Sequence, residues 1–275
     1  MSRRKKYLFF IGIMILAGIG KVYYDTNIFK VETVTMKTEK LASNQSFTIL
    51  QLTDIHNKEF GKENESLLKK VQDIDPDIVV ITGDLISRQT DQLDNAFELV
   101  EKLVELNPNI YYVSGNHEWE NPLREKLFEG LEKRNVRMID NQNALVEIDN
   151  MLIQIAGVAD VSTEHDRLDL AAEGLAEDYF TLLLSHAPDV MENDYPGEID
   201  LILSGHTHGG QIRLPLIGAF IAPDQGFFPK YDKGLFTLKE GQQLYIDSGL
   251  GTSTVPVRLF NQSQMTLFTI EGIAD

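Results

Sequence analysis

The sequence predicts an α/β domain that follows an N-terminal apolar helix. Two observations define the domain: short β-rich runs alternate with helical patterns as far as Leu131, and the rest of the chain is rich in strand patterns. The alternation predicts that the first strands are parallel, and we expect the later strands to form a second sheet. We find no internal repeat and no second domain boundary.

The N-terminus carries four cations followed by an uncharged apolar stretch over residues 7–20. At ~1.5 Å per residue this stretch spans roughly 21 Å, and counting to Tyr24 with Lys21 snorkelling gives roughly 27 Å, close to a bilayer core of ~30 Å. Residues 1–24 therefore favour a retained signal-anchor helix. The cations predict that the N-terminus stays cytoplasmic and that the domain lies outside as a single-pass membrane protein.

Two alternatives remain for this segment. A cleaved signal peptide would release a secreted domain, although no A-x-A site follows the apolar stretch, only the weaker Gly18-x-Gly20. A buried core helix fits the cationic cluster and the terminal position poorly.

The elements of the rest of the chain follow in order. Residues 25–46 are polar and mixed, and we expect a tether or an edge strand before a domain over residues 47–275. Strands are predicted at 47–53, 77–82, 110–114, 152–159, 180–185, 200–204, 244–247 and 265–270. Helical faces lie at 67–74 and 93–104, and Asn121 and Pro122 predict the start of a third helix through Leu131.

Composition excludes several classes of protein. The chain has 25 Lys and Arg against 42 Asp and Glu, a formal net charge of −17. Such a chain repels nucleic acid backbones, so we expect no general nucleic acid binding. The absence of cysteine excludes thiolate nucleophiles, cysteine-ligated zinc, iron–sulfur clusters and disulfides.

Five predicted strands end in a small polar residue and then a side chain that can bind a metal. These side chains are Asp54 and His56, then Asp84, then Asn116 and His117, then His186, then His206 and His208. Ligands of open α/β sheets lie beyond the carboxyl ends of the strands, where loops converge. Each motif alone is common in ordinary turns, but five of the six histidines fall in these segments. We therefore predict one shared metal site.

The donor types restrict the metal. Oxygen and imidazole donors without thiolate suit Mn²⁺, Fe or Zn²⁺ and disfavour Cu(I) and Ca²⁺. The donors are too many for one tetrahedral site but suffice for two ions that share a bridging carboxylate. We predict two divalent ions, with Mn²⁺ preferred and Fe or Zn²⁺ as alternatives.

These motifs, in this order, resemble the signature of the calcineurin-like metallophosphoesterases: T-D-I-H, G-D-L, G-N-H-E, S-H-A-P-D and G-H-T-H-G-G-Q. The resemblance covers roughly Phe47 to Ile270 and is closer to a YkuE/YaeI-like branch of membrane-associated or exported phosphoesterases. That branch is similar in the stretches G-G-Q-I-R-L-P-L-I-G-A-F and P-V-R-L-F-N. The family implies a four-layer α-β-β-α sandwich, with two sheets flanked by helices.

The resemblance also implies a role for each site residue. The first metal would be held by Asp54, His56 and His208, the second by Asn116, His186 and His206, and both by Asp84. His117 would face the substrate as a general acid or charge stabiliser. The implied chemistry is in-line attack by activated water on phosphorus.

Four other basic residues lie outside the metal motifs. Arg88 stands at an arginine position of the phosphoprotein-phosphatase branch, but Ser87 and Gln89 beside it do not match that branch. We interpret Arg88, Arg213 and Arg258 as solvated loop residues, with phosphate contact as the alternative. His165 lies in an acidic loop and is interpreted as solvated.

Two functions from different classes fit the motifs. The preferred one is a binuclear phosphoesterase on the outer face of a cytoplasmic membrane. Its substrate would be a lipid-linked or UDP-diacylglucosamine-like phosphoester, an extracellular nucleotide or phosphodiester, or a wall polymer phosphate. The alternative is a metal-binding but catalytically weak membrane or wall scaffold, which would have no need of His117.

Residues 214–236 follow the last metal motif directly and contain three prolines and five aromatic residues. The prolines exclude a regular helix or strand interior. We expect a long loop that folds its aromatic side chains into the core. The alternative is an apolar wall beside the metals that holds an acyl chain or rests on the bilayer.

Overall fold

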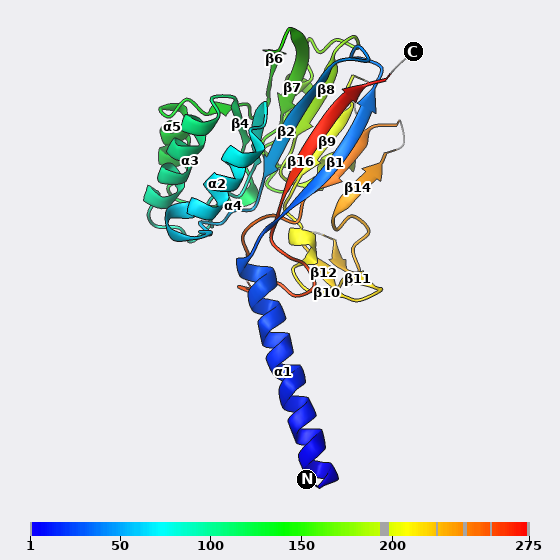
Figure 1. The fold of residues 1–275 in the computed structure, drawn as a ribbon. Coiled ribbons are helices and arrows are strands. Elements are labelled where there is room, and N and C mark those ends of the chain that lie inside the picture. Colours follow the sequence, from blue (N-terminus) through cyan, green and yellow to red (C-terminus); the bar gives the residue numbers. More distant parts are fainter. Residues whose placement is uncertain (1, 193–197, 224, 239–240, 254, 274–275) are drawn as a thin grey trace.

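The computed structural model describes residues 2–192, 198–223, 225–238, 241–253 and 255–273. It shows two six-stranded sheets stacked face to face, with one long helix, α1 (Arg3–Asn27), projecting from one end of the domain (Figure 1). The predicted four-layer α/β class is confirmed, and the outer layers differ greatly in thickness.

The first sheet has the strand order β1-β16-β2-β3-β4-β5. Strands β2 to β5 are parallel, as the alternation with helices predicts. The strands are β1 (Lys30–Thr38), β2 (Ser46–Leu52), β3 (Ile78–Thr82), β4 (Ile110–Val113), β5 (Arg137–Met138) and β16 (Gln264–Gly272). Residues 30–38, in the segment expected to be a tether or an edge strand, form the edge strand of this sheet.

The position of β16 corrects the sequence prediction. We expected the last strand in the second sheet, but it lies in the first sheet between β1 and β2, antiparallel to β2. Its side chains alternate between two cores: Met265 faces the helices, while Phe268 and Ile270 face the second sheet. A strand that is apolar on both faces is stabilised at the centre of a sheet, where both faces are covered.

The second sheet has the order β14-β15-β9-β8-β7-β6, with an antiparallel strand at each edge. The strands are β6 (Gln142–Ile148), β7 (Met151–Gly157), β8 (Phe180–Leu184), β9 (Leu201–Ser204), β14 (Gly234–Thr237) and β15 (Gln243–Ile246). Its inner face packs on the first sheet through buried apolar residues such as Phe47 and Phe180, whose ring centroids lie 5.7 Å apart.

The two outer faces are covered unequally. Helices cover the first sheet: η1 (Lys62–Asn64), α2 (Glu65–Ile74), α3 (Asp94–Leu106), α4 (Asn116–Trp119) and α5 (Arg124–Glu132). The third predicted helix, α5, begins three residues after Asn121, whose side chain accepts from the Leu123 N–H at 2.7 Å and forms a turn instead of a cap. Over the second sheet the described helices are only α6 (Leu168–Ala171) and η2 (Pro188–Glu192).

Helix α1 is long and apolar enough to cross a membrane, and its apolar window is not buried by the domain. At ~1.5 Å per residue it extends roughly 37 Å. Its last residues dock on the domain: Asp25 and Thr26 are buried, the Ser263 N–H donates to the Asp25 carbonyl at 2.8 Å, and the Arg258 N–H donates to Thr26 Oγ1 at 2.9 Å.

Candidate metal centre

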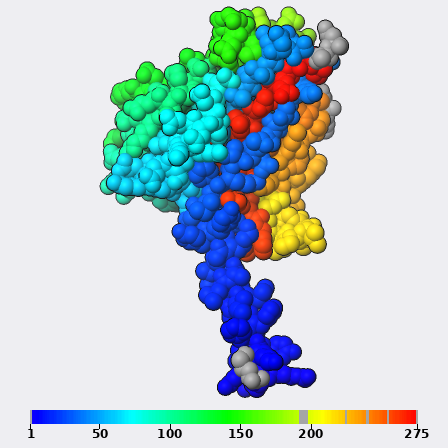
Figure 2. Space-filling view, in the orientation of Figure 1, coloured from blue at the N-terminus to red at the C-terminus, as the bar shows by residue number. Residues whose placement is uncertain are grey.

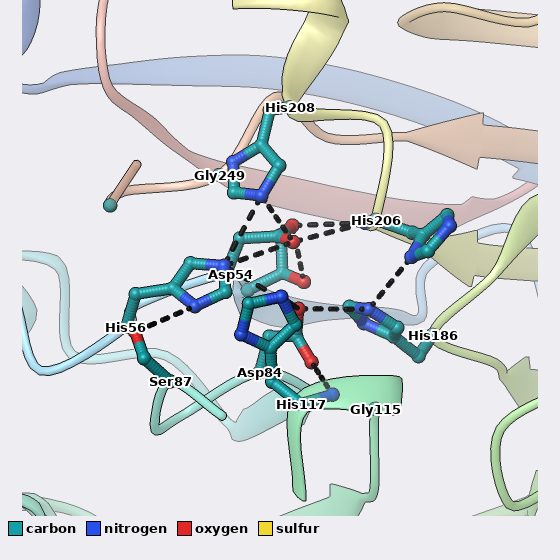
Figure 3. A network of polar contacts seen from close by, with 12 residues as sticks. Asp54, His56, Asp84, Ser87, Gly115, His117, His186, His206, His208 and Gly249 are labelled. Carbon is teal, nitrogen blue, oxygen red and sulfur yellow. Dashed lines mark hydrogen bonds and ion pairs between the residues drawn. The ribbon is translucent and has the colours of Figure 1, made fainter. Parts of the chain in front are cut away.

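All of the predicted site residues lie at one end of the two sheets. Asp54, Asp84 and Asn116 follow β2, β3 and β4 of the first sheet, and His186 and His206 follow β8 and β9 of the second. The carboxyl ends of these parallel strands meet at the same edge, so both sheets contribute to one cluster (Figure 3). Every one of these side chains is at least nine-tenths buried.

Four donors form one half of the cluster. The ligand atoms of Asp54, His56, Asp84 and His208 all lie within 4.8 Å of one another. His56 Nε2 is 3.2 Å from His208 Nε2, and His208 Nε2 is 3.5 Å from Asp54 Oδ1. Two imidazole nitrogens facing each other beside a carboxylate form a donor set for a divalent cation.

The other half of the cluster is built around Asn116. Its Oδ1 lies 3.2 Å from His186 Nε2 and 3.2 Å from His206 Nδ1. His186 Nδ1 donates to the Thr82 carbonyl at 2.8 Å. This backbone contact orients the ring so that Nε2 points into the cluster, as in outer-shell contacts of metal-bound histidines.

Asp84 lies between the two halves. Its Oδ2 is 3.4 Å from His56 Nε2 and 3.3 Å from His186 Nε2. Figure 3 shows His56 and His208 on one side of this carboxylate and His186 and His206 on the other. The donor set therefore fits two divalent ions that share one carboxylate, and it contains no thiolate.

The electrostatics of the cluster favour a cation. Burial raises the pKa of Asp54 to about 6 and lowers the pKa of His56 to about 3. Burial also opposes charge on Asp84, but the neighbouring His186 outweighs it and holds the pKa of Asp84 well below its usual value. Burial likewise opposes charge on His186, but Asp84 outweighs it and keeps the pKa of His186 well above its usual value. Positive charge is thus stabilised beside Asp84.

The backbone of the metal motifs is strained and closely packed. Asp54, His56, Asp84, His206 and His208 all have φ between 50° and 67°. Such left-handed conformations cost on the order of 1–3 kcal/mol each and concentrate at functional sites. Gly205 has no room for a side chain, because a Cβ there would lie 2.4 Å from Asp54 Oδ2. The close approach of the two sheets at Asp54 therefore requires glycine.

His117 lies beside the cluster with a defined tautomer. The Arg88 N–H donates to His117 Nδ1 at 3.1 Å, so the ring proton of neutral His117 is on Nε2. That Nε2 is 3.9 Å from Asp84 Oδ2 and faces the cluster. Burial lowers the pKa of His117 to about 4. Neutral His117 thus directs an N–H donor toward the space beside the metal donors.

Glu118 is a positioning residue to which our sequence reasoning gave no role. Its side chain is buried and accepts from three backbone N–H groups, those of Asp84 at 2.8 Å, Gly115 at 2.8 Å and Ile86 at 3.1 Å. Burial, with Asp84 nearby, raises its pKa to about 8. The available signal was a glutamate at the third position of a helix, which commonly reaches back to the N-terminal N–H.

Comparison with known proteins identifies the family. The model of the calcineurin-like phosphoesterase family matches residues 47–210, more than half of the chain. The chain belongs to the calcineurin-like phosphoesterase family. The predicted family is therefore confirmed, and this phosphoesterase is a metal-dependent hydrolase of phosphoester bonds.

Relatives of this phosphoesterase extend over most of the chain. An uncharacterized metallophosphoesterase of Aquifex aeolicus is 31% identical over 261 residues, covering 91% of this chain and 95% of its own. The uncharacterized metallophosphoesterase YkuE of Bacillus subtilis is 26% identical, covering 91% and 88%. A 5′-nucleotidase precursor structure from Thermus thermophilus shares the fold, with a TM-score of 0.51, 14% identity, and coverage of 74% of this chain and 48% of that one.

Arg258 corrects a second sequence interpretation. We interpreted it as solvated, with phosphate contact as the alternative, but it is fully buried. Its guanidinium donates to the carbonyls of Ser248 and Gly251. The Gly251 N–H in turn donates to the Asp54 carbonyl at 2.6 Å. Arg258 therefore supports the backbone of a metal-site residue from behind.

The other three interpretations have mixed outcomes. Arg88 is exposed and pairs with Glu120 at 3.0 Å, consistent with a solvated residue. Arg213 is half-buried and stabilises the loop that carries His206 and His208. Its Nη1 donates to the Gly209 carbonyl at 3.0 Å and to Asp232 at 2.6 Å. His165 is exposed but stacks on Trp119 with centroids 3.6 Å apart.

Removing the Arg258 guanidinium should affect both the fold and the metal site. Arg258→Met should leave two buried carbonyls without donors and lower the free energy of unfolding by about 2–5 kcal/mol. It should also weaken metal binding by about 10–100-fold, the usual effect of losing an outer-shell support. Denaturant unfolding and metal titration of the full chain in detergent measure both quantities. Arg88→Met is the matched exposed control, and equal behaviour of the two variants would contradict the role given to Arg258.

Proposed function

We propose that this protein is a two-metal phosphoesterase that cleaves a phosphodiester or pyrophosphate bond at a membrane surface. The observation that carries the proposal is the position of Asp84, whose Oδ2 lies 3.4 Å from His56 Nε2 and 3.3 Å from His186 Nε2. In this proposal Asp54, His56 and His208 would hold one ion, Asn116, His186 and His206 would hold the other, and Asp84 would serve both.

Two bound ions would supply a reactive water at neutral pH and charge neutralisation at phosphorus. Every other task falls to the chain itself. His117 presents its Nε2–H to the substrate phosphoryl group or to the leaving oxygen. Glu118 holds the loop that carries Asp84, and the Thr82 carbonyl holds His186. The oxygen and imidazole donors favour Mn²⁺, with Fe or Zn²⁺ as alternatives.

The geometry of α1 supports a lipid-linked substrate. The helix ends on the segment that contains Arg258, and Arg258 supports the loop behind Asp54. In Figure 1 α1 joins the domain at the end where α4 and the loop after the metal motif lie. If α1 spans the bilayer with its cationic N-terminus in the cytoplasm, the metal centre faces the outer leaflet.

Metal removal and a substrate panel test this proposal. The full chain in detergent should lose at least about 10³-fold in rate after chelation, equivalent to roughly 4 kcal/mol of transition-state stabilisation. Adding Mn²⁺ should restore the rate and return two ions per chain. A diester or pyrophosphate with a lipid tail should react faster than the matching monoester and than its tail-free head group. A metal-free enzyme with an unchanged rate would refute the two-metal mechanism, and equal rates with and without the tail would refute the lipid-linked substrate.

A further inference from the structure

An apolar collar lies at the end of the domain where α1 joins it. The collar consists of exposed apolar side chains in residues 212–228 and in the segment 255–260. Its elements are β10 (Arg213–Leu214), β11 (Gly218–Ala219), β12 (Ile221–Ala222) and β13 (Gly226–Phe227), which follow η3 (His208–Gly210). We propose that this collar sits in the interfacial layer of the bilayer that α1 enters.

The aromatic residues of this region divide into two groups. Tyr231 and Phe236 pack against the core outside the second sheet, as the expectation of a folded-in loop required. Phe227 and Phe228 do not, since 66% and 62% of their surfaces are exposed. The expectation is therefore wrong for the part of the loop formed by β10 to β13, called the tip below, which presents its aromatic side chains outward.

The exposed tip is an ordered structure. Two antiparallel pairs, β10 with β11 and β12 with β13, form its backbone. Phe220 contacts both Phe227 and Phe228 edge to face, with ring centroids 5.3 and 5.5 Å away. Asp232 accepts from Arg213 and from the Ala219 N–H, which fastens the base of the tip to the domain. A surface of this kind is built to hold large apolar side chains in a fixed outward position.

The position of the collar identifies what covers it. Phe260, half exposed, lies beside α1, with its ring centroid 5.8 Å from Lys21 Nζ. Ile212 pairs with Leu259, so the tip continues directly from this contact. Lys21 ends the apolar stretch of α1, and Tyr23 and Tyr24 beyond it are exposed, a pattern typical of the membrane interface. The collar therefore lies beside the part of α1 at which the helix would leave the hydrocarbon.

Figures 1 and 2 show the same arrangement, with the yellow segment of the tip beside the base of the helix. The loop that carries His206 and His208 packs directly against this tip. A Cβ at Gly210 would be 2.3 Å from Ala219 Cβ and 3.0 Å from the Ile221 carbonyl. Contact with lipid would thus hold the metal centre at the bilayer surface. This inference concerns the placement of the domain and does not depend on the proposed activity.

Site-directed fluorescence can test the collar directly, because the chain has no native cysteine. Phe227→Cys and Ile217→Cys, each carrying a polarity-sensitive dye, should be reconstituted as full-length protein in phosphatidylcholine vesicles. Lipid with brominated acyl chains should quench both dyes more than about twofold, as expected for groups ~5–10 Å inside the headgroup boundary. The matched control is Leu145→Cys on β6, an exposed apolar residue on the strand at the far end of the domain in Figure 1.

The control dye should be quenched by aqueous iodide and not by brominated lipid. Dyes at residues 217 and 227 that behave like the control would overturn the proposal. Protection from iodide without quenching by lipid would also overturn it, because that result indicates cover by a second copy of the chain. Circular dichroism verifies folding, and both labelled residues are more than half exposed, so the substitutions remove no core contact.

Discussion

Replacing Asp84 with asparagine should abolish metal binding in both halves of the cluster and lower the rate by at least about 10³-fold. The substitution keeps the size of the side chain but removes the negative charge that lies within 3.4 Å of both His56 and His186. A neutral amide cannot bridge two cations as a carboxylate can. Metal content and turnover of an aryl phosphodiester, measured on the full chain, check this expectation.

Asp200→Asn is the matched control for that experiment. Asp200 is a half-buried carboxylate at the opposite end of β9, paired with Lys40 at 2.8 Å. Its replacement should leave metal content and turnover unchanged, with at most a small loss of stability. If Asp84→Asn bound two ions and turned over normally, the assignment of the shared ligand would be wrong.

The part of the site that could be predicted from sequence lies in short, continuous motifs. A strand that ends in a small residue followed by a metal-binding side chain can be recognised in five or six consecutive residues. The rule that parallel strands expose their carboxyl ends together brings such motifs to one edge. Asp54, Asp84 and His186 could therefore be placed in one site, although they come from two sheets.

The unpredicted parts depend on contacts between distant segments. Arg258 looks like any loop arginine in the sequence, and its burial follows from carbonyls seven and ten residues before it and from Thr26 on α1. β16 was assigned to the wrong sheet because its apolar pattern reports burial on both faces but not which neighbours provide it. The apolar pattern of one sequence does not indicate which of the two sheets a strand joins.

The connection between α1 and Asp54 is of this nonlocal kind. Thr26 accepts from the Arg258 N–H, the Arg258 side chain donates to Gly251, and Gly251 donates to Asp54. Four residues thus link the end of a membrane-type helix to the metal centre through buried hydrogen bonds. Such bonds have few alternative partners, so the orientation of the domain relative to α1 is defined by the fold rather than by a flexible tether.

Replacing His117 with alanine should keep both metal ions bound and slow turnover by ~10²–10⁴, the usual contribution of a positioned proton donor. His117 Nε2 is 3.9 Å from Asp84, farther than the ligand atoms of His56 and His186, and its Nδ1 is occupied by the Arg88 N–H. The ring therefore points an N–H toward the substrate space.

The leaving group separates the two roles that remain for this N–H. If His117 protonates the leaving oxygen, it must do so as the imidazolium, which requires a proton on Nδ1 and loss of the contact with the Arg88 N–H. In that case the rate loss in His117→Ala should shrink for aryl esters with acidic leaving groups. If it only stabilises the phosphoryl oxygens, the loss should be the same for all leaving groups, and His117→Gln, which retains an N–H donor, should recover part of the rate. Loss of metal from His117→Ala would contradict both roles and would place the histidine among the ligands.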